Sequence, residues 1–127
     1  MKNLKEGKIR KGVIVYARTA RRNQCHNPYQ RGDELDRQQD VCRKYSKERD
    51  LNVLAVILEI GDGTDFQRPG LQALLSYCED DTAGTVSAII ITKPECLMSD
   101  VSDYVDLSEM LGEYGIEIFA IGEDTEE

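Results

Sequence analysis

The chain has 127 residues, an apolar share of 40%, a charged share of 31% and a net charge of −8. This length allows one compact domain with a single core, and the composition is that of a globular rather than a disordered chain. No apolar run approaches the roughly 20 residues that cross a bilayer, and no signal-peptide pattern follows the basic start. We therefore expect a cytoplasmic protein without a membrane partner.

Positive charge is concentrated at the amino-terminal end. Residues 1–31 carry nine Lys or Arg and one acid, a balance of +8, whereas residues 32–127 carry seven Lys or Arg and 23 acids, a balance of −16. Broad electrostatic binding to nucleic acid needs many cations that displace counterions, so the acidic remainder argues against it. An anion site must lie in the first third of the chain, and residues 1–11 are interpreted as a solvated basic tail.

Four apolar runs alternate with three helical patterns. The runs 13–17, 53–58, 86–91 and 116–121 are rich in β-branched residues and nearly continuous in hydrophobicity, which predicts strands covered on both faces. Apolar spacing predicts a first helix over 34–49 and a second that Pro69 opens. A third begins at Ser99 or Asp100 as N-cap and ends at Gly115.

The order β-α-β-α-β-α-β predicts an α/β domain with a mostly parallel four-stranded sheet and helices on both faces. We place this domain at residues 12–122, followed by an acidic tail at 123–127. In such sheets the functional crevice lies at the carboxyl ends of the strands. The segments 18–33, 59–68 and 92–100 are predicted to meet there.

The first of these segments contains Arg18, Arg21 and Arg22 directly after a buried strand. It is longer than the two to six residues usual for such a turn, and long loops at this edge are commonly functional. Neither a Gly-x-Gly-x-x-Gly pattern nor a P-loop lysine pattern is present, so these modes of nucleotide binding have no support. The segment predicts a phosphate or other anion site.

Two groups of residues are candidates for metal binding. Glu59, Asp62 and Asp65 could hold a metal ion, but we favour a flexible acidic loop in which Arg68 pairs with a carboxylate. The cysteines form no C-x-x-C pair and His26 is the one histidine, so zinc is not expected. Cys42 and Cys78 fall on apolar helix faces and are interpreted as core residues. We predict no metal and no cofactor.

Four stretches in order resemble one family, the serine recombinases (resolvases and DNA invertases), in its catalytic domain. They read YARTARRNQ from Tyr16, LDRQQDVC, GDGTDFQRPGLQALL and AIIITKPECLMSD, and the resemblance covers residues 12–122. It implies a three-layer resolvase-like fold and site-specific DNA strand exchange through a phosphoserine link. The residues predicted to bind phosphate or DNA are Tyr16, Arg18, Arg21, Arg22, Gln24, Gln38, Arg68 and Lys93.

The chain departs from the family pattern where the chemistry is done. Ala20 stands at the position of the nucleophilic serine and has no attacking atom. In KPECLMS, Glu95 replaces an aspartate, while Cys96 and Ser99 replace two arginines that would face the phosphate. Asp62 adds negative charge nearby. With Arg18 and Arg68 kept but the nucleophile lost, the resemblance implies a catalytically inactive domain that acts through protein contacts.

Two other interpretations stay open. In the first, the chain is an active recombinase with a displaced nucleophile, for which Thr19, Ser99 and Cys96 are the candidates. Thr19 should point away from the face of Ala20, and Glu95 beside Cys96 disfavours a thiolate. In the second, the chain is a small anion- or nucleotide-binding module that uses Arg18, Arg21, Arg22 and Arg68.

The family's long dimer-forming helix and its DNA-binding domain would follow the fourth strand, and the printed chain ends at Glu127. The resemblance therefore implies that DNA is bound weakly by this acidic chain alone. As protein partners it implies a second copy or a related recombinase, for instance one from the same mobile element.

Overall fold

The computed structural model describes residues 11–20 and 28–122, and contains the predicted strands and helices in the predicted order. Its elements are β1 (Gly12–Thr19), α1 (Pro28–Glu48), β2 (Asn52–Ile60), α2 (Pro69–Glu79), β3 (Val86–Ile91), the 3₁₀ helix η1 (Pro94–Cys96), α3 (Val101–Glu113) and β4 (Glu117–Ala120). In the described ranges, no helix is long and apolar enough to span a membrane.

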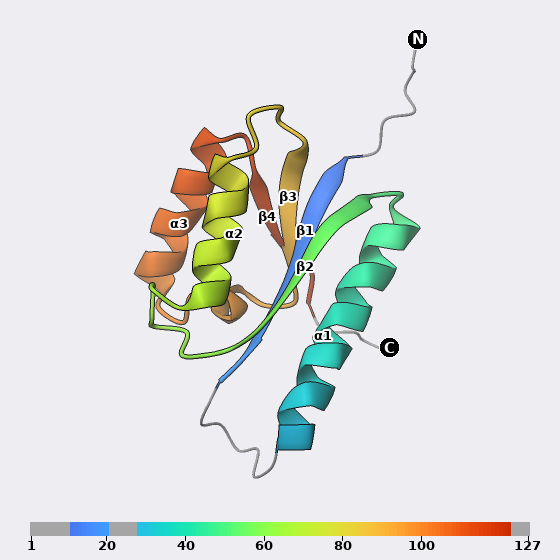
Figure 1. The fold of residues 1–127 in the computed structure, drawn as a ribbon, viewed down its shortest axis with the longest axis vertical. Helices are drawn as coiled ribbons and strands as arrows, with labels where there is room; N and C mark the ends of the chain where they lie inside the picture. Colours follow the sequence, from blue (N-terminus) through green and yellow to red (C-terminus); the bar gives the residue numbers. More distant parts are fainter. Residues whose placement is uncertain (1–10, 21–27, 123–127) are drawn as a thin grey trace.

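The four strands form one parallel sheet in the order β2-β1-β3-β4. Helix α1 covers one face, whereas α2 and α3 lie side by side on the other (Figure 1). This arrangement confirms the predicted three-layer α/β fold. The central strand β1 pairs with β2 along its whole length but with β3 only over Gly12–Val15, so its last residues extend beyond β3.

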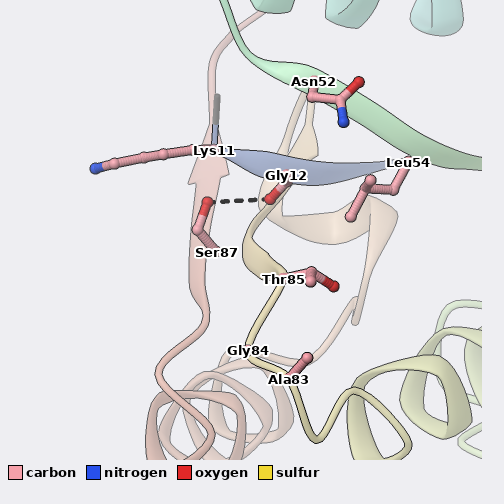
Figure 2. Close-up of a pocket in the computed structure, with 8 residues that line it drawn as sticks. All are labelled: Lys11, Gly12, Asn52, Leu54, Ala83, Gly84, Thr85 and Ser87. Carbon is pink, nitrogen blue, oxygen red and sulfur yellow. Dashed lines mark hydrogen bonds between the residues drawn. The ribbon is translucent and has the colours of Figure 1, made fainter. Parts of the chain in front are cut away.

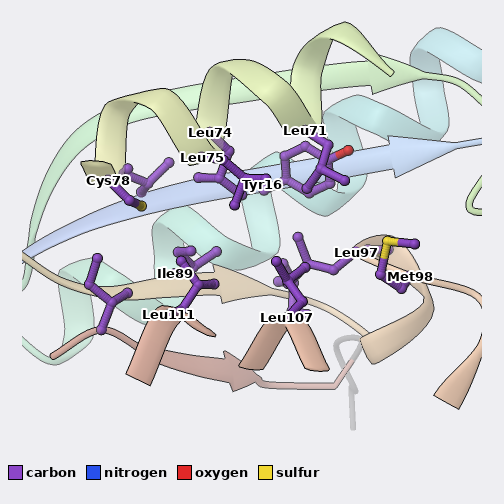
Figure 3. Packing of buried hydrophobic residues seen from close by; sticks show 14 of the residues in the cluster. Tyr16, Leu71, Leu74, Leu75, Cys78, Ile89, Leu97, Met98, Leu107 and Leu111 are labelled. Carbon is purple, nitrogen blue, oxygen red and sulfur yellow. The ribbon is translucent and has the colours of Figure 1, made fainter. Parts of the chain in front are cut away.

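Two apolar layers pack against the sheet because side chains alternate along β1. Ile14 and Tyr16 join the larger cluster, which α2, α3 and the segment after β3 cover (Figure 3). Val13 and Val15 join the smaller cluster, which includes Cys42 of α1. Both clusters are built around the same strand, and this holds the end of β1 in a fixed position.

Two expectations about the elements were wrong. Helix α1 begins at Pro28 rather than near residue 34. The prediction missed its first turns because they are polar and carry no apolar spacing. The outer strands are not covered on both faces, since Leu58, Ile60 and Phe119 are 44%, 41% and 37% exposed. β2 and β4 are the two edges of the sheet, and α1 packs mainly against β1 and β2.

The predicted ends of α3 are confirmed. The Asp100 side chain accepts hydrogen bonds from the backbone amides of Ser102 and Asp103 at 2.8 and 3.2 Å, which satisfies two free N–H groups of the first turn. After the helix, Gly115 has a φ of +80°, a left-handed conformation that glycine adopts without strain.

Candidate active site at the carboxyl edge of the sheet

Three chain segments meet at the carboxyl edge, defined as the carboxyl ends of β1, β2 and β3. They are the end of β1, the 61–68 loop after β2 and the 92–99 loop after β3 (Figure 1). The two loops are joined directly by a hydrogen bond from the Ser99 amide to the Gly63 carbonyl at 3.1 Å. The convergence predicted from the strand order is therefore present.

Arg68 is the most buried charged residue described at this edge, with 2% of its surface exposed. Its Nε lies 3.2 Å from Glu59 Oε1 and donates to the Tyr16 hydroxyl at 3.0 Å. That hydroxyl donates in turn to Glu59 Oε1 at 2.6 Å. Burial and the hydrogen bond to Glu59 raise the pKa of Tyr16 far above its usual value. The tyrosine therefore stays protonated and donates to the buried carboxylate.

The remaining nitrogens of Arg68 donate to the backbone of both loops. Nη1 reaches the Asp65 carbonyl at 3.1 Å and the Asp62 carbonyl at 3.4 Å. Nη2 donates to the carbonyls of Leu97 and Cys96, the latter at 3.4 Å. Arg68 pairs with a carboxylate, as the favoured interpretation of this loop expected, but the partner is Glu59 at the end of β2.

Arg18 is half-buried and lies on the same face of β1 as Tyr16. Its guanidinium donates to three backbone carbonyls, those of Gly61 at 2.7 Å, Cys96 at 3.0 Å and Glu95 at 2.6 Å. Burial lowers the pKa of Arg18, and the nearby charge of Arg68 lowers it further. The two cations predicted to hold phosphate thus face each other across the carbonyl of Cys96.

Gln38 of α1 takes the place of a strand beside the end of β1. Its Oε1 accepts from the Arg18 amide at 3.1 Å, and its Nε2 donates to the Arg18 carbonyl at 3.0 Å. β3 no longer pairs with β1 at this height, so the side-chain amide satisfies backbone groups that would otherwise be unpaired. The Cys96 thiol approaches the same Oε1 at 3.5 Å.

The position at which the resemblance places the nucleophile, Ala20, lies directly after β1. Ala20 is half-buried and, by alternation, shares the face of Arg18, whereas Thr19 is buried on the face that α1 covers. Of the two positions at which the resemblance implies arginines, Cys96 is 5% exposed and contacts Thr92, while Ser99 is exposed. These positions lie at one edge of the sheet, and the side chain at position 20 is a methyl group without a hydroxyl.

Lys93 contributes charge to this edge near the start of α1. Burial alone would raise the pKa of Glu34, but hydrogen bonds from Arg37 and Gln38, together with the positive charges of Arg37 and Lys93, hold it below the usual value. Lys93 is therefore close enough to α1 to act on its acidic side chain. The predicted residues Arg21, Arg22 and Gln24 lie outside the described residues.

The carboxylates of the 61–68 loop accept hydrogen bonds from residues of the same loop. Asp62 accepts from the Thr64 amide and hydroxyl, both at 2.8 Å, and these bonds hold its pKa below the usual value. Asp65 accepts from the Gln67 amide at 2.9 Å. Within the described part of the chain, no group of three His, Cys, Asp or Glu side chains is placed to hold a metal ion.

Two contacts at this edge were not specified by the sequence. The sequence predicted a carboxylate partner for Arg68 without choosing among Glu59, Asp62 and Asp65, and it predicted Gln38 as a pocket residue rather than as the partner of the β1 backbone. A single acid near the end of an otherwise apolar strand indicates an ion pair, because a buried carboxylate needs a cation. Nothing in the sequence indicates that β1 stops pairing with β3 after Val15, so the sequence carries no comparable signal for the role of Gln38.

A hollow of about 490 Å³ lies at the opposite edge, where β1, β2 and β3 begin (Figure 2). The Ser87 hydroxyl donates to the Gly12 carbonyl at its wall at 3.0 Å. Lys11 is the one charged side chain among its described lining residues, and it is exposed. This hollow lacks the buried charges that distinguish the carboxyl edge.

Comparisons with known proteins identify the family and the fold. The family model described as Resolvase, N terminal domain matches residues 13–127. The structure is similar to the C-terminal catalytic domain of ISC1926 TnpA, an IS607-like serine recombinase, with 22% identity and a TM-score of 0.73 over 90% of this chain and 72% of that one. A search of curated protein sequences gave no significant match.

Two further solved structures agree. The N-terminal catalytic domain of TP901-1 integrase is 20% identical, with a TM-score of 0.72 over 87% of this chain and 77% of that one. A serine recombinase from Sulfolobus solfataricus is 28% identical, with a TM-score of 0.62 over 92% of this chain and 72% of that one. The resemblance stated from the sequence is confirmed for the family and for the fold.

Proposed function

The chain belongs to the resolvase family, in its N-terminal domain, and from this premise we propose that it is a non-catalytic member that acts through protein contacts. The observation that carries the proposal is the identity of the residue directly after β1. Ala20 lies beside Arg18 at the carboxyl edge, and its methyl group has no oxygen that could attack a phosphodiester.

The missing cations support the same conclusion. A nucleophilic serine needs several positive charges around the phosphate, which stabilise the transition state and lower the pKa of the attacking hydroxyl. One cation of this kind can contribute about 10³-fold to phosphoryl transfer. Cys96 and Ser99 supply no charge, and Glu95 and Asp62 add negative charge to the same edge.

We therefore expect no covalent protein–DNA adduct when the purified chain is incubated with a pool of DNA duplexes that carry a randomised central segment. The readout is protein-linked DNA on a denaturing gel, and an intact serine recombinase with its own site serves as the control for trapping. An adduct that mass spectrometry maps to Thr19, Cys96 or Ser99 would replace this proposal with that of a displaced nucleophile.

A protein-binding role is supported by apolar side chains on the surface of α3. Val101 and Val105 are 77% and 45% exposed and lie one helical turn apart, on one side of the helix. Exposed apolar side chains that gather on one helix face are typical of protein interfaces. We propose a second copy of this chain as the partner.

Sedimentation velocity tests this partner. The wild-type chain is expected to sediment as a dimer with rising concentration, and Val105→Glu to remain a monomer, because a carboxylate would be buried at the contact. Gln39→Glu adds the same charge to the surface of α1, on the opposite face of the sheet, and should leave association unchanged. A wild-type chain that stays monomeric at every concentration would contradict self-association.

A further inference from the structure

We propose that Arg18 and Arg68, together called the arginine pair, tie the 61–68 loop to the 92–99 loop through backbone carbonyls, and that Arg18 serves in this chain to position the loops. Each guanidinium donates to both loops. Arg18 reaches Gly61 in one loop and Glu95 and Cys96 in the other. Arg68 does the same from the buried side of the edge.

The charge balance at this edge supports a structural role. Two guanidinium groups close together repel, and the pKa of Arg18 is lowered by its burial and, to a smaller extent, by the positive charge of Arg68. Among the described residues, Glu59 is the carboxylate that pairs with Arg68. The carbonyl dipoles of the two loops supply the remaining negative ends, and the Cys96 carbonyl accepts from both arginines.

The two loops make few other contacts with each other. The direct backbone contact recorded between them in the described residues is the bond from Ser99 to Gly63. Gly63 sits so close to the opposite loop that a Cβ atom there would lie 2.0 Å from Ser99 Oγ and 2.7 Å from Arg18 Nη2. The approach of the loops therefore depends on a glycine on one side and on Arg18 between them.

A structural Arg18 and a phosphate-binding Arg18 predict opposite signs for one measurement. A cation that awaits a ligand beside a second cation is a source of repulsion, and its removal leaves stability unchanged or raises it, as is common for functional residues. A cation that ties two loops together stabilises the fold, and its removal breaks the three hydrogen bonds of Arg18, two of which are partly buried.

This inference deepens the proposed function and rests on it in one respect, because a domain that cuts no DNA does not need Arg18 for phosphate. The two can fail separately. The loss of cleavage is read from a covalent adduct, whereas the arginine pair is read from thermal stability and hydrogen exchange in the absence of DNA.

The test is the melting temperature of Arg18→Met in the full chain. We expect a fall of at least about 4 °C, because the change removes three hydrogen bonds, two of them partly buried, and a loss of about 1 kcal/mol lowers the melting temperature of a domain of this size by about 4 °C. Arg18→Lys should also melt lower than wild type, because an ammonium group cannot reach three diverging carbonyls. Arg43→Met, at an exposed arginine of α1, is the control and should stay within about 2 °C of wild type.

Hydrogen exchange and inorganic phosphate complete the test. In Arg18→Lys the Ser99 amide should exchange faster, while the core amide of Ile90 keeps its wild-type rate. Inorganic phosphate should not raise the melting temperature of the wild-type chain. The inference is overturned by Arg18→Met melting at or above wild type, by Arg18→Lys matching wild type, or by a phosphate-induced rise that Arg18→Met abolishes.

Discussion

Arg68→Met is expected to lower the free energy of unfolding by about 3–5 kcal/mol, the usual loss when one partner of a buried ion pair is removed. The substitution leaves the Glu59 carboxylate buried, with the Tyr16 hydroxyl and the Gly70 amide as its remaining recorded donors. It also removes the donors to the Asp65 and Leu97 carbonyls. Urea unfolding, followed by circular dichroism, measures the loss.

The chain offers a matched control for this prediction. Arg68 lies over the ring of Tyr16 and pairs with Glu59. Arg49 likewise lies over the ring of Tyr45 and pairs with Glu48, but it is on the surface, with about half of its side chain exposed. Arg49→Met should lower stability by no more than about 1 kcal/mol. Equal losses for Arg49→Met and Arg68→Met would show that burial of the pair contributes nothing.

A double substitution separates the charge from the packing. Glu59→Gln combined with Arg68→Met removes both charges, so no carboxylate is left without a cation. The double variant should therefore be more stable than the sum of the two single losses predicts, by about 0.5–3 kcal/mol of interaction free energy. Strict additivity would contradict a direct coupling between Glu59 and Arg68.

The second large effect concerns an attempt to restore the family's chemistry. The triple variant Ala20→Ser, Cys96→Arg, Ser99→Arg is expected to lose about 1–3 kcal/mol of stability from overpacking alone and to form no covalent adduct. Cys96 is 5% exposed and touches Thr92 and Gln38, so this site has no room for an arginine side chain. The larger residue would also disturb the bonds of Gln38 to the Arg18 backbone.

The double variant Ala20→Ser, Ser99→Arg is the control for that experiment. Both positions are accessible to solvent, and its stability should lie within about 0.5 kcal/mol of wild type. A triple variant as stable as this double variant, or one that forms an adduct at position 20 on the randomised duplex pool, would contradict the prediction. Either result would mean that the pocket has kept the space that catalysis requires.

The sequence predicted the strands and helices well because their signals are local. β3 was predicted with its observed ends, and the Asp100 cap and the Gly115 end of α3 depend on neighbouring residues only. The start of α1 was missed because its first turns lack apolar spacing. The exposure of Leu58 and Phe119 was missed because an apolar run does not reveal that its strand lies at a sheet edge.

The sequence by itself determined the order of elements, the meeting of three segments at one edge, and the absence of a hydroxyl at position 20, since each of these follows from residue types in chain order. Only the tertiary structure decided what the remaining arginines do. Gly61 and Cys96 lie 43 and 78 residues from Arg18 along the chain, Cys96 lies 28 residues from Arg68, and hydrogen bonds to backbone carbonyls leave no mark in the sequence. Such contacts depend on how closely two loops approach, and packing sets that distance.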